Sequence, residues 1–159
     1  MTAMLEIKNL SKTFNAGTIN EKVALDHIHL TLNEGDFVTV IGGNGAGKST
    51  MLNAVAGVWP IDEGAIILDG QNITGYPDFK RASLIGRVFQ DPMMGTAPDM
   101  QIIENLALAA RRGKRRTLKW GVTKREKDDY KEQLKILDLG LENRLTQKVG
   151  LLSGGQRQA

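Results

Sequence analysis

Residues 42–49 read Gly42-Gly43-Asn44-Gly45-Ala46-Gly47-Lys48-Ser49, and Thr50 follows them. This stretch matches the pattern G-x-x-x-x-G-K-[ST] at every fixed position. Its glycines let successive backbone N–H groups turn into one concavity, where a polyphosphate fits. Lys48 supplies a point charge to the outer phosphates, and the hydroxyl of Ser49 is a ligand for Mg²⁺. The stretch therefore predicts a site for a nucleoside polyphosphate with its magnesium ion.

The segments on either side of this loop support that prediction. Residues 37–41 form a nearly continuous apolar run, which is typical of a strand covered on both faces. After the loop, apolar residues recur at helical spacing from Met51 to Ala56, and Gly57 stands where a helix would end. A strand, a glycine-rich loop and a helix in this order bring the positive end of the helix to the bound anion.

Strands are expected mainly before residue 92 and helices after it. Apolar patterns predict further strands over residues 5–10, 23–32, 65–68 and 84–89. Asp69-Gly70 is a turn signal after the third of these. Helices are predicted from Ile102 to Ala110, with Asp99 near the start, and from Lys124 to Leu139. Ser153 is expected to cap one more helix, which gives an α/β arrangement.

Composition excludes several classes of protein. The 159 residues are 41% hydrophobic and 25% charged, which is ordinary for a globular domain. The absence of cysteine excludes a disulfide framework, a thiolate metal site and a cysteine nucleophile. The longest apolar run, Leu106–Ala110, is too short to span a membrane. We therefore expect a soluble, intracellular protein.

Basic residues are concentrated in one segment. The net charge is only +3, yet six basic residues and no acidic residue lie between Arg111 and Lys119. Three interpretations of residues 111–119 stay open: a solvated surface, a contact with anionic lipid headgroups, or a contact with nucleic acid. Because Trp120 is the one aromatic residue nearby, the nucleic-acid signal is weak, and no nucleic-acid partner is expected.

A second glycine motif, Leu152-Ser153-Gly154-Gly155-Gln156, stands near the C-terminus. Paired with the loop at 42–50, it resembles the signature of ATP-binding cassette (ABC) ATPases, the motor domains of ABC transporters. The resemblance runs along the whole chain and implies an ABC-type P-loop NTPase of the α/β class. It implies an N-terminal antiparallel β subdomain with the phosphate-loop part of an incomplete RecA-like core in residues 1–91. Residues 92–159 would form the helical subdomain that ends in the signature.

The resemblance also implies roles for single residues. Phe14 falls where the family has an aromatic residue that stacks on adenine, and Val23 where it has a second adenine-side contact. Gln90 matches the glutamine that positions the metal and the attacking water and links them to the transmembrane partner. ATP would thus bind at Phe14, Val23 and residues 42–50, with Mg²⁺ held by Ser49 and Gln90. Lys48 and Gln90 would serve hydrolysis.

The family pairs two such domains head to tail, so that each ATP lies between two subunits. Ser153, Gly154, Gly155 and Gln156 would then contact, in trans, the nucleotide held by the other subunit's phosphate loop. The implied partners are a second ATP-binding subunit, in a homodimer or a heterodimer, and separate transmembrane permease chains. The implied location is cytoplasmic, peripheral on the inner face of the cell membrane.

The family's Walker B acids and its switch histidine would follow the signature, beyond Ala159. We therefore expect a C-terminally truncated ABC ATPase that binds ATP–Mg²⁺ without turnover and exposes apolar surface beside the phosphate loop. His27 and His29 lie too early in the chain to replace the histidine and are expected to be solvated. Two alternatives stay open: a non-transport ABC-type ATPase of translation or DNA maintenance, and a regulatory nucleotide-binding module.

Overall fold

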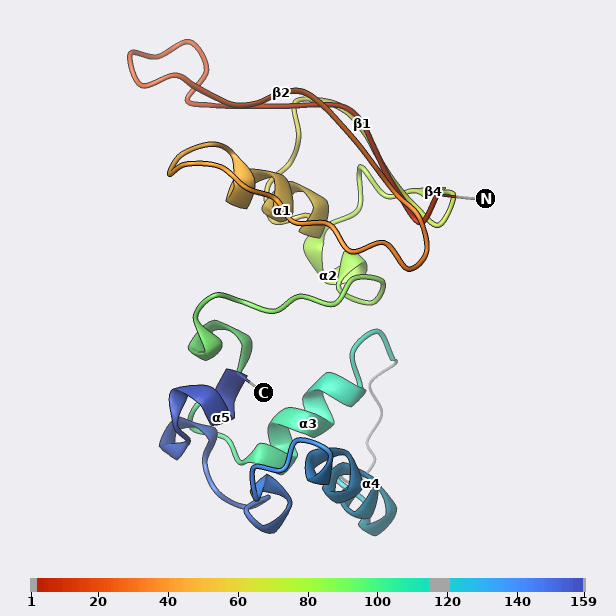
Figure 1. Ribbon diagram of the computed structural model, residues 1–159, viewed down its shortest axis with the longest axis vertical. Coiled ribbons are helices and arrows are strands. Elements are labelled where there is room, and N and C mark those ends of the chain that lie inside the picture. Colours follow the sequence, from red (N-terminus) through yellow and green to blue (C-terminus); the bar gives the residue numbers. More distant parts are fainter. Residues whose placement is uncertain (1–2, 115–120, 159) are drawn as a thin grey trace. The chain divides into compact units, whose positions relative to one another are not determined.

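The computed structural model describes residues 3–114 and 121–158, which fall into two compact units, Met1–Ile85 and Gly86–Ala159 (Figure 1). The division precedes the expected boundary after Asp91, so Gln90 belongs to the second unit. Within the basic segment, residues 115–119 lie outside the described residues, as does Trp120.

The first unit is built on an antiparallel sheet with the strand order β2-β1-β3-β4. Its strands are β1 (Leu5–Phe14), β2 (Lys22–Leu32), β3 (Glu63–Leu68) and β4 (Gln71–Asn72). Asp69 and Gly70 connect β3 to β4 with φ of 47° and 73°. Positive φ at both central residues is what a two-residue hairpin turn of type I′ requires, so the predicted turn is confirmed.

Helix α1 (Lys48–Ala56) follows the phosphate loop and contributes Ala54 to the core of this unit. The core otherwise consists of sheet residues and Ile73; its fully buried members include Ile7, Leu10 and Ile66. Gly57 ends α1 in the left-handed conformation with a φ of 79°, as the sequence predicts. The short helix α2 (Asp78–Arg81) comes next in the chain.

Two predicted strands are wrong, because residues 37–41 and 84–89 have no regular secondary structure. A strand requires a neighbour that pairs with its N–H and C=O groups, and no strand among the described residues pairs with either segment. Phe37 is 94% exposed and Ile41 is 88% exposed. The apolar surface expected beside the phosphate loop is therefore present.

The second unit is helical. It contains η1 (Pro92–Gly95), α3 (Ile102–Ala110), α4 (Lys124–Lys135), η2 (Leu141–Asn143), η3 (Val149–Leu151) and α5 (Gly154–Gln158). Its core is one cluster formed by Ile102, Ile103, Ala107, Tyr130, Leu134, Leu141, Leu145, Val149 and Leu152. No helix within residues 3–114 and 121–158 has the length and apolar character needed to cross a lipid bilayer.

Helix α3 has the predicted bounds, and its N-cap is Gln101, which forms a reciprocal capping box with Glu104, while Asp99 lies two residues earlier. Helix α4 ends at Lys135, before the predicted Leu139, and Asp138 then takes a positive φ of 52°. Arg111, in the basic segment, donates to Glu126 at 3.1 Å. At least one positive charge of the basic segment is therefore paired within the second unit.

Candidate nucleotide site

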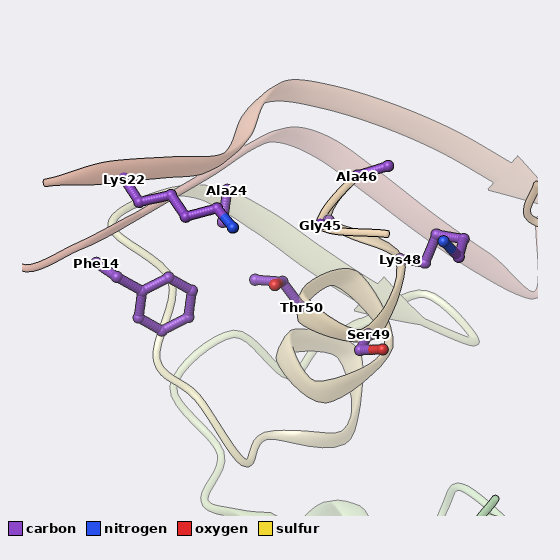
Figure 2. A pocket seen from close by; sticks show the side chains of 9 residues that line it. Phe14, Lys22, Ala24, Gly45, Ala46, Lys48, Ser49 and Thr50 are labelled. Carbon is purple, nitrogen blue, oxygen red and sulfur yellow. The ribbon is translucent and has the colours of Figure 1, made fainter. Parts of the chain in front are cut away.

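A cavity in the first unit gathers the end of β1, the start of β2 and the loop that precedes α1 (Figure 2). The residues that line it are Phe14, Lys22, Ala24, Gly45, Ala46, Gly47, Lys48, Ser49 and Thr50. The structure therefore brings the predicted aromatic residue and most of the predicted phosphate loop to one place.

The loop backbone is shaped to receive an anion. Gly45 and Gly47 have φ of 81° and 83°, in the left-handed region that glycine adopts without strain. Gly47 is the N-cap of α1 and leaves the first turn without a side-chain cap. Backbone amides at the start of α1 thus stay available to a ligand, at the positive end of the helix.

The Lys48 ammonium is held by its own loop. Its Nζ donates to the carbonyl oxygens of Gly42 and Gly43, at 2.6 Å and 2.7 Å. Gly42, Gly43 and the exposed Asn44 do not line the cavity, and the two glycines act through this contact with Lys48. A phosphate that recruits Lys48 must therefore replace two carbonyl acceptors with its own oxygens.

Of the two residues predicted to contact adenine, one lines the cavity and the other does not. Phe14 lines the cavity, and its ring meets the ring of Trp59 edge-to-face, with centroids 5.0 Å apart. Val23 does not line the cavity and is 57% exposed. Successive strand residues face opposite sides, so Lys22 and Ala24, not Val23, lie on the cavity side of β2.

Asp62 fixes the end of β1 that carries Phe14. Its carboxylate accepts from Lys12 Nζ at 2.7 Å and from the Thr13 backbone N–H at 2.6 Å. The hydrogen bond from Lys12, followed by that from Thr13, lowers the pKa of Asp62 below its ordinary value of 3.8. Neither Asp62 nor Trp59 belongs to a recognisable sequence motif, so the sequence alone did not indicate that they support the site.

Replacing Asp62 with asparagine is expected to change the acid dependence of stability. Because its pKa is lowered on folding, the carboxylate stabilises the fold above pH 3.8, and this contribution is lost as the pH falls through the folded-state pKa. Near pH 7, Asp62→Asn should have a lower melting temperature than the wild type. This difference in melting temperature should shrink as the pH falls toward about 3. Thermal melts across that range test this, with Asp99→Asn, whose side chain is 98% exposed, as control. A difference independent of pH would contradict it.

The signature residues lie in the second unit. Ser153 Oγ accepts from the Gln156 backbone N–H at 3.3 Å, and the Ser153 N–H donates to Gln156 Oε1 at 3.2 Å. This reciprocal pair starts α5 and confirms the predicted cap. Gly154 and Gly155 are exposed at that start, and Gln90 is exposed elsewhere in the unit. The roles of these residues toward a nucleotide stay predictions.

The two histidines are exposed, as expected. His27 Nδ1 lies 2.5 Å from Asp26 Oδ1, and its Nε2 lies 3.9 Å from Glu63. In the part of the chain that the structure describes, no group of three or more His, Asp or Glu side chains could hold a metal ion. Ser49 is exposed and lines the cavity, and its hydroxyl is an oxygen ligand of the kind that Mg²⁺ binds.

A phosphate loop between a sheet and the start of a helix, opening on a cavity with an aromatic side chain, defines a P-loop nucleotide-binding protein. The model of the ABC transporter family matches residues 25–159, and the chain belongs to this family. It is similar to solved ATP-binding cassettes, which confirms the expected fold class. One is a dimeric cassette in a post-hydrolysis state bound to ADP and Pi, with a TM-score of 0.78 at 30% identity, over 97% of this chain and 65% of that one.

Curated relatives are named as transport proteins. The chain is 40% identical to the tyrosine transport ATP-binding protein of Clostridioides difficile, over 98% of its own length and 62% of that protein's. It is 36% identical to the spermidine/putrescine import ATP-binding protein PotA of Haemophilus influenzae, again over 98% of its own length but 37% of that protein's. The chain thus spans less than two thirds of these relatives.

Proposed function

We propose that the chain is the nucleotide-binding part of an ABC transporter's ATPase subunit. That subunit couples the binding and hydrolysis of ATP to transport through separate permease chains. The observation that carries the proposal is the cavity, in which Phe14, the start of α1 and Lys48 converge. The transport relatives favour this function over a non-transport ATPase or a regulatory module, since both are named as ATP-binding proteins of transport or import.

Each part of the cavity has a role in this function. The Phe14 ring offers a face for the adenine base, and the loop amides hold the phosphates. Lys48 leaves the carbonyls of Gly42 and Gly43 to pair with the outer phosphates. Ser49 would hold Mg²⁺, which neutralises phosphate charge when bound. The role of Gln90 toward the metal rests on the family resemblance alone. Thr50 is buried at the first turn of α1 and lines the cavity beside the loop.

The signature would complete the site of a second subunit. The exposed amides of Gly154 and Gly155, the Ser153 side chain and Gln156 would face the nucleotide of the other cassette in a head-to-tail homodimer or heterodimer. The similar cassette bound to ADP and Pi is dimeric, which supports this part of the proposal. Binding of ATP would then join two subunits, and hydrolysis would release them.

The permease partners define the location that we propose. A subunit that couples to membrane-spanning chains lies at the cytoplasmic face of the cell membrane without crossing it. Contact of residues 111–119 with anionic headgroups would reinforce this position, since each basic residue near such a surface adds about 1 kcal/mol of attraction. We also propose that the first unit contains the β subdomain and the second contains the helical subdomain.

The Lys48→Ala variant tests nucleotide binding directly. Removal of a cation that pairs with phosphates is expected to raise the Kd for ATP–Mg²⁺ by about tenfold or more. Trp59 supplies the signal because its ring contacts Phe14, and a Trp120→Phe background leaves it as the one tryptophan. Lys8→Met is the control, since Lys8 is half exposed, pairs with Glu6 at 2.6 Å and does not line the cavity. Equal affinities in all three proteins, or no saturable binding by the wild type, would refute the proposal.

A further inference from the structure

A second lysine lines the nucleotide cavity, at a position outside the phosphate-loop motif. Lys22 is the first residue of β2 and pairs in register with Phe14 of β1. Both side chains line the cavity, and Figure 2 shows the Lys22 amine between the Phe14 ring and Gly45. Its Nζ lies 3.5 Å from the point that a Cβ on Gly45 would occupy. The amine therefore lies against the loop, on the side of the aromatic ring.

The Lys22 ammonium has no acidic partner among the described residues of the first unit. Its neighbour Glu21 accepts instead from the Gly17 N–H at 2.6 Å, and Lys12 on the adjacent strand pairs with Asp62. Within residues 3–114 and 121–158, no carboxylate forms an ion pair with Lys22, and none lines the cavity. Lys48 differs, because two carbonyls of its own loop hold it.

We propose that Lys22 is a phosphate-binding residue that contacts the α-phosphate of the nucleotide. The inference rests on the proposed nucleotide-binding function. A nucleotide with its base on Phe14 and its outer phosphates at Lys48 has its α-phosphate between them, where the Lys22 amine lies (Figure 2). A lysine contacts phosphate as a mobile point charge, and a cavity without carboxylates leaves that charge free for the anion.

The position of the contact predicts a pattern among ligands. The α-phosphate is shared by ATP and ADP, whereas the γ-phosphate belongs to ATP alone. Removal of the Lys22 charge should therefore raise the Kd for ATP and the Kd for ADP by the same factor, about five- to tenfold. Because the amine is solvent-accessible, the loss should shrink as the salt concentration rises.

The test compares Lys22→Met with Lys22→Arg and Lys8→Met in the 159-residue chain. The Kd values for ATP–Mg²⁺ and ADP–Mg²⁺ are measured by titration calorimetry. We expect Lys22→Met to weaken both equally, Lys22→Arg to restore most of the affinity, and Lys8→Met to bind like the wild type. Thermal melts of each variant separate loss of binding from loss of the fold.

Two results would overturn the inference alone: unchanged affinities in Lys22→Met while Lys48→Ala is impaired, or a loss confined to ATP, which would place the amine at the γ-phosphate. A wild-type chain that binds neither nucleotide would overturn the proposed function, and this inference with it. The two failures are therefore distinguishable in one set of measurements.

Discussion

Replacing Arg81 with methionine is expected to lower the free energy of unfolding of the first unit by about 3 kcal/mol or more. The Arg81 side chain is buried, with 3% of the residue exposed. Its guanidinium donates to four backbone carbonyls: Ala54 at 2.7 Å, Val55 at 2.9 Å, Thr74 at 2.7 Å and Tyr76 at 2.9 Å. Each of these carbonyls would lose a hydrogen-bond donor.

The position of Arg81 explains the size of this effect. Ala54 and Val55 belong to the last turn of α1, which carries the negative end of the helix. The Ala54 carbonyl also accepts from the Gly57 N–H at 3.1 Å, so Arg81 is its second donor. A cation there satisfies the carbonyls and the helix dipole together. Burial lowers the pKa of Arg81, and its carbonyl partners hold the charge in place of water. A methionine would fill the space of the stem without providing a donor.

Urea unfolding of Arg81→Met and Arg144→Met measures the effect. Arg144 is exposed in the second unit, so the same chemical change there should cost little. Weaker ATP binding is expected in Arg81→Met as well, because α1 would lose the anchor of its C-terminal end. Similar losses of stability in the two variants would show that the four carbonyl contacts contribute little.

Features encoded by neighbouring residues could be predicted from the sequence. The phosphate loop, the Gly57 end of α1, the Asp69-Gly70 turn and the Ser153 cap each depend on a few adjacent residues. Their backbone conformations follow from local sterics and side chain–backbone hydrogen bonds, which a motif states directly. Phe14 lines the cavity as well, but it was predicted from the family resemblance and not from a local motif, and its contact with adenine stays a prediction.

Features that depend on distant partners could not be predicted. Residues 37–41 have the composition of a buried strand, but a strand exists only beside a pairing neighbour, and periodicity carries no information about that neighbour. The register of β2 with β1 contains irregularities, so the choice of Lys22 and Ala24 over Val23 required the structure. No sequence pattern predicts that Arg81 is buried, because arginine side chains are mostly exposed in folded proteins.

Replacing Gly47 with alanine is expected to abolish nucleotide binding and to destabilise the first unit. Gly47 has a φ of 83°, where a residue with a Cβ is strained by about 1–2 kcal/mol. A Cβ there would overlap with the carbonyl oxygen of Ala24 and lie 3.2 Å from a methyl carbon of Leu25. Relief of that overlap moves the loop away from β2. Ala24 is itself a wall of the cavity, so the loop amides and Phe14 would no longer face one ligand.

Gly43→Ala is the matched control in the same loop. Gly43 has no positive φ, and a Cβ there would meet no atom within 4 Å, so the substitution should leave the melting temperature nearly unchanged. Differential scanning calorimetry and ATP titration of the two variants measure both effects. Equal melting temperatures would mean that the loop adapts to a side chain at Gly47. A stable Gly47→Ala protein that binds ATP like the wild type would show that close packing of the loop on β2 is not what forms the site.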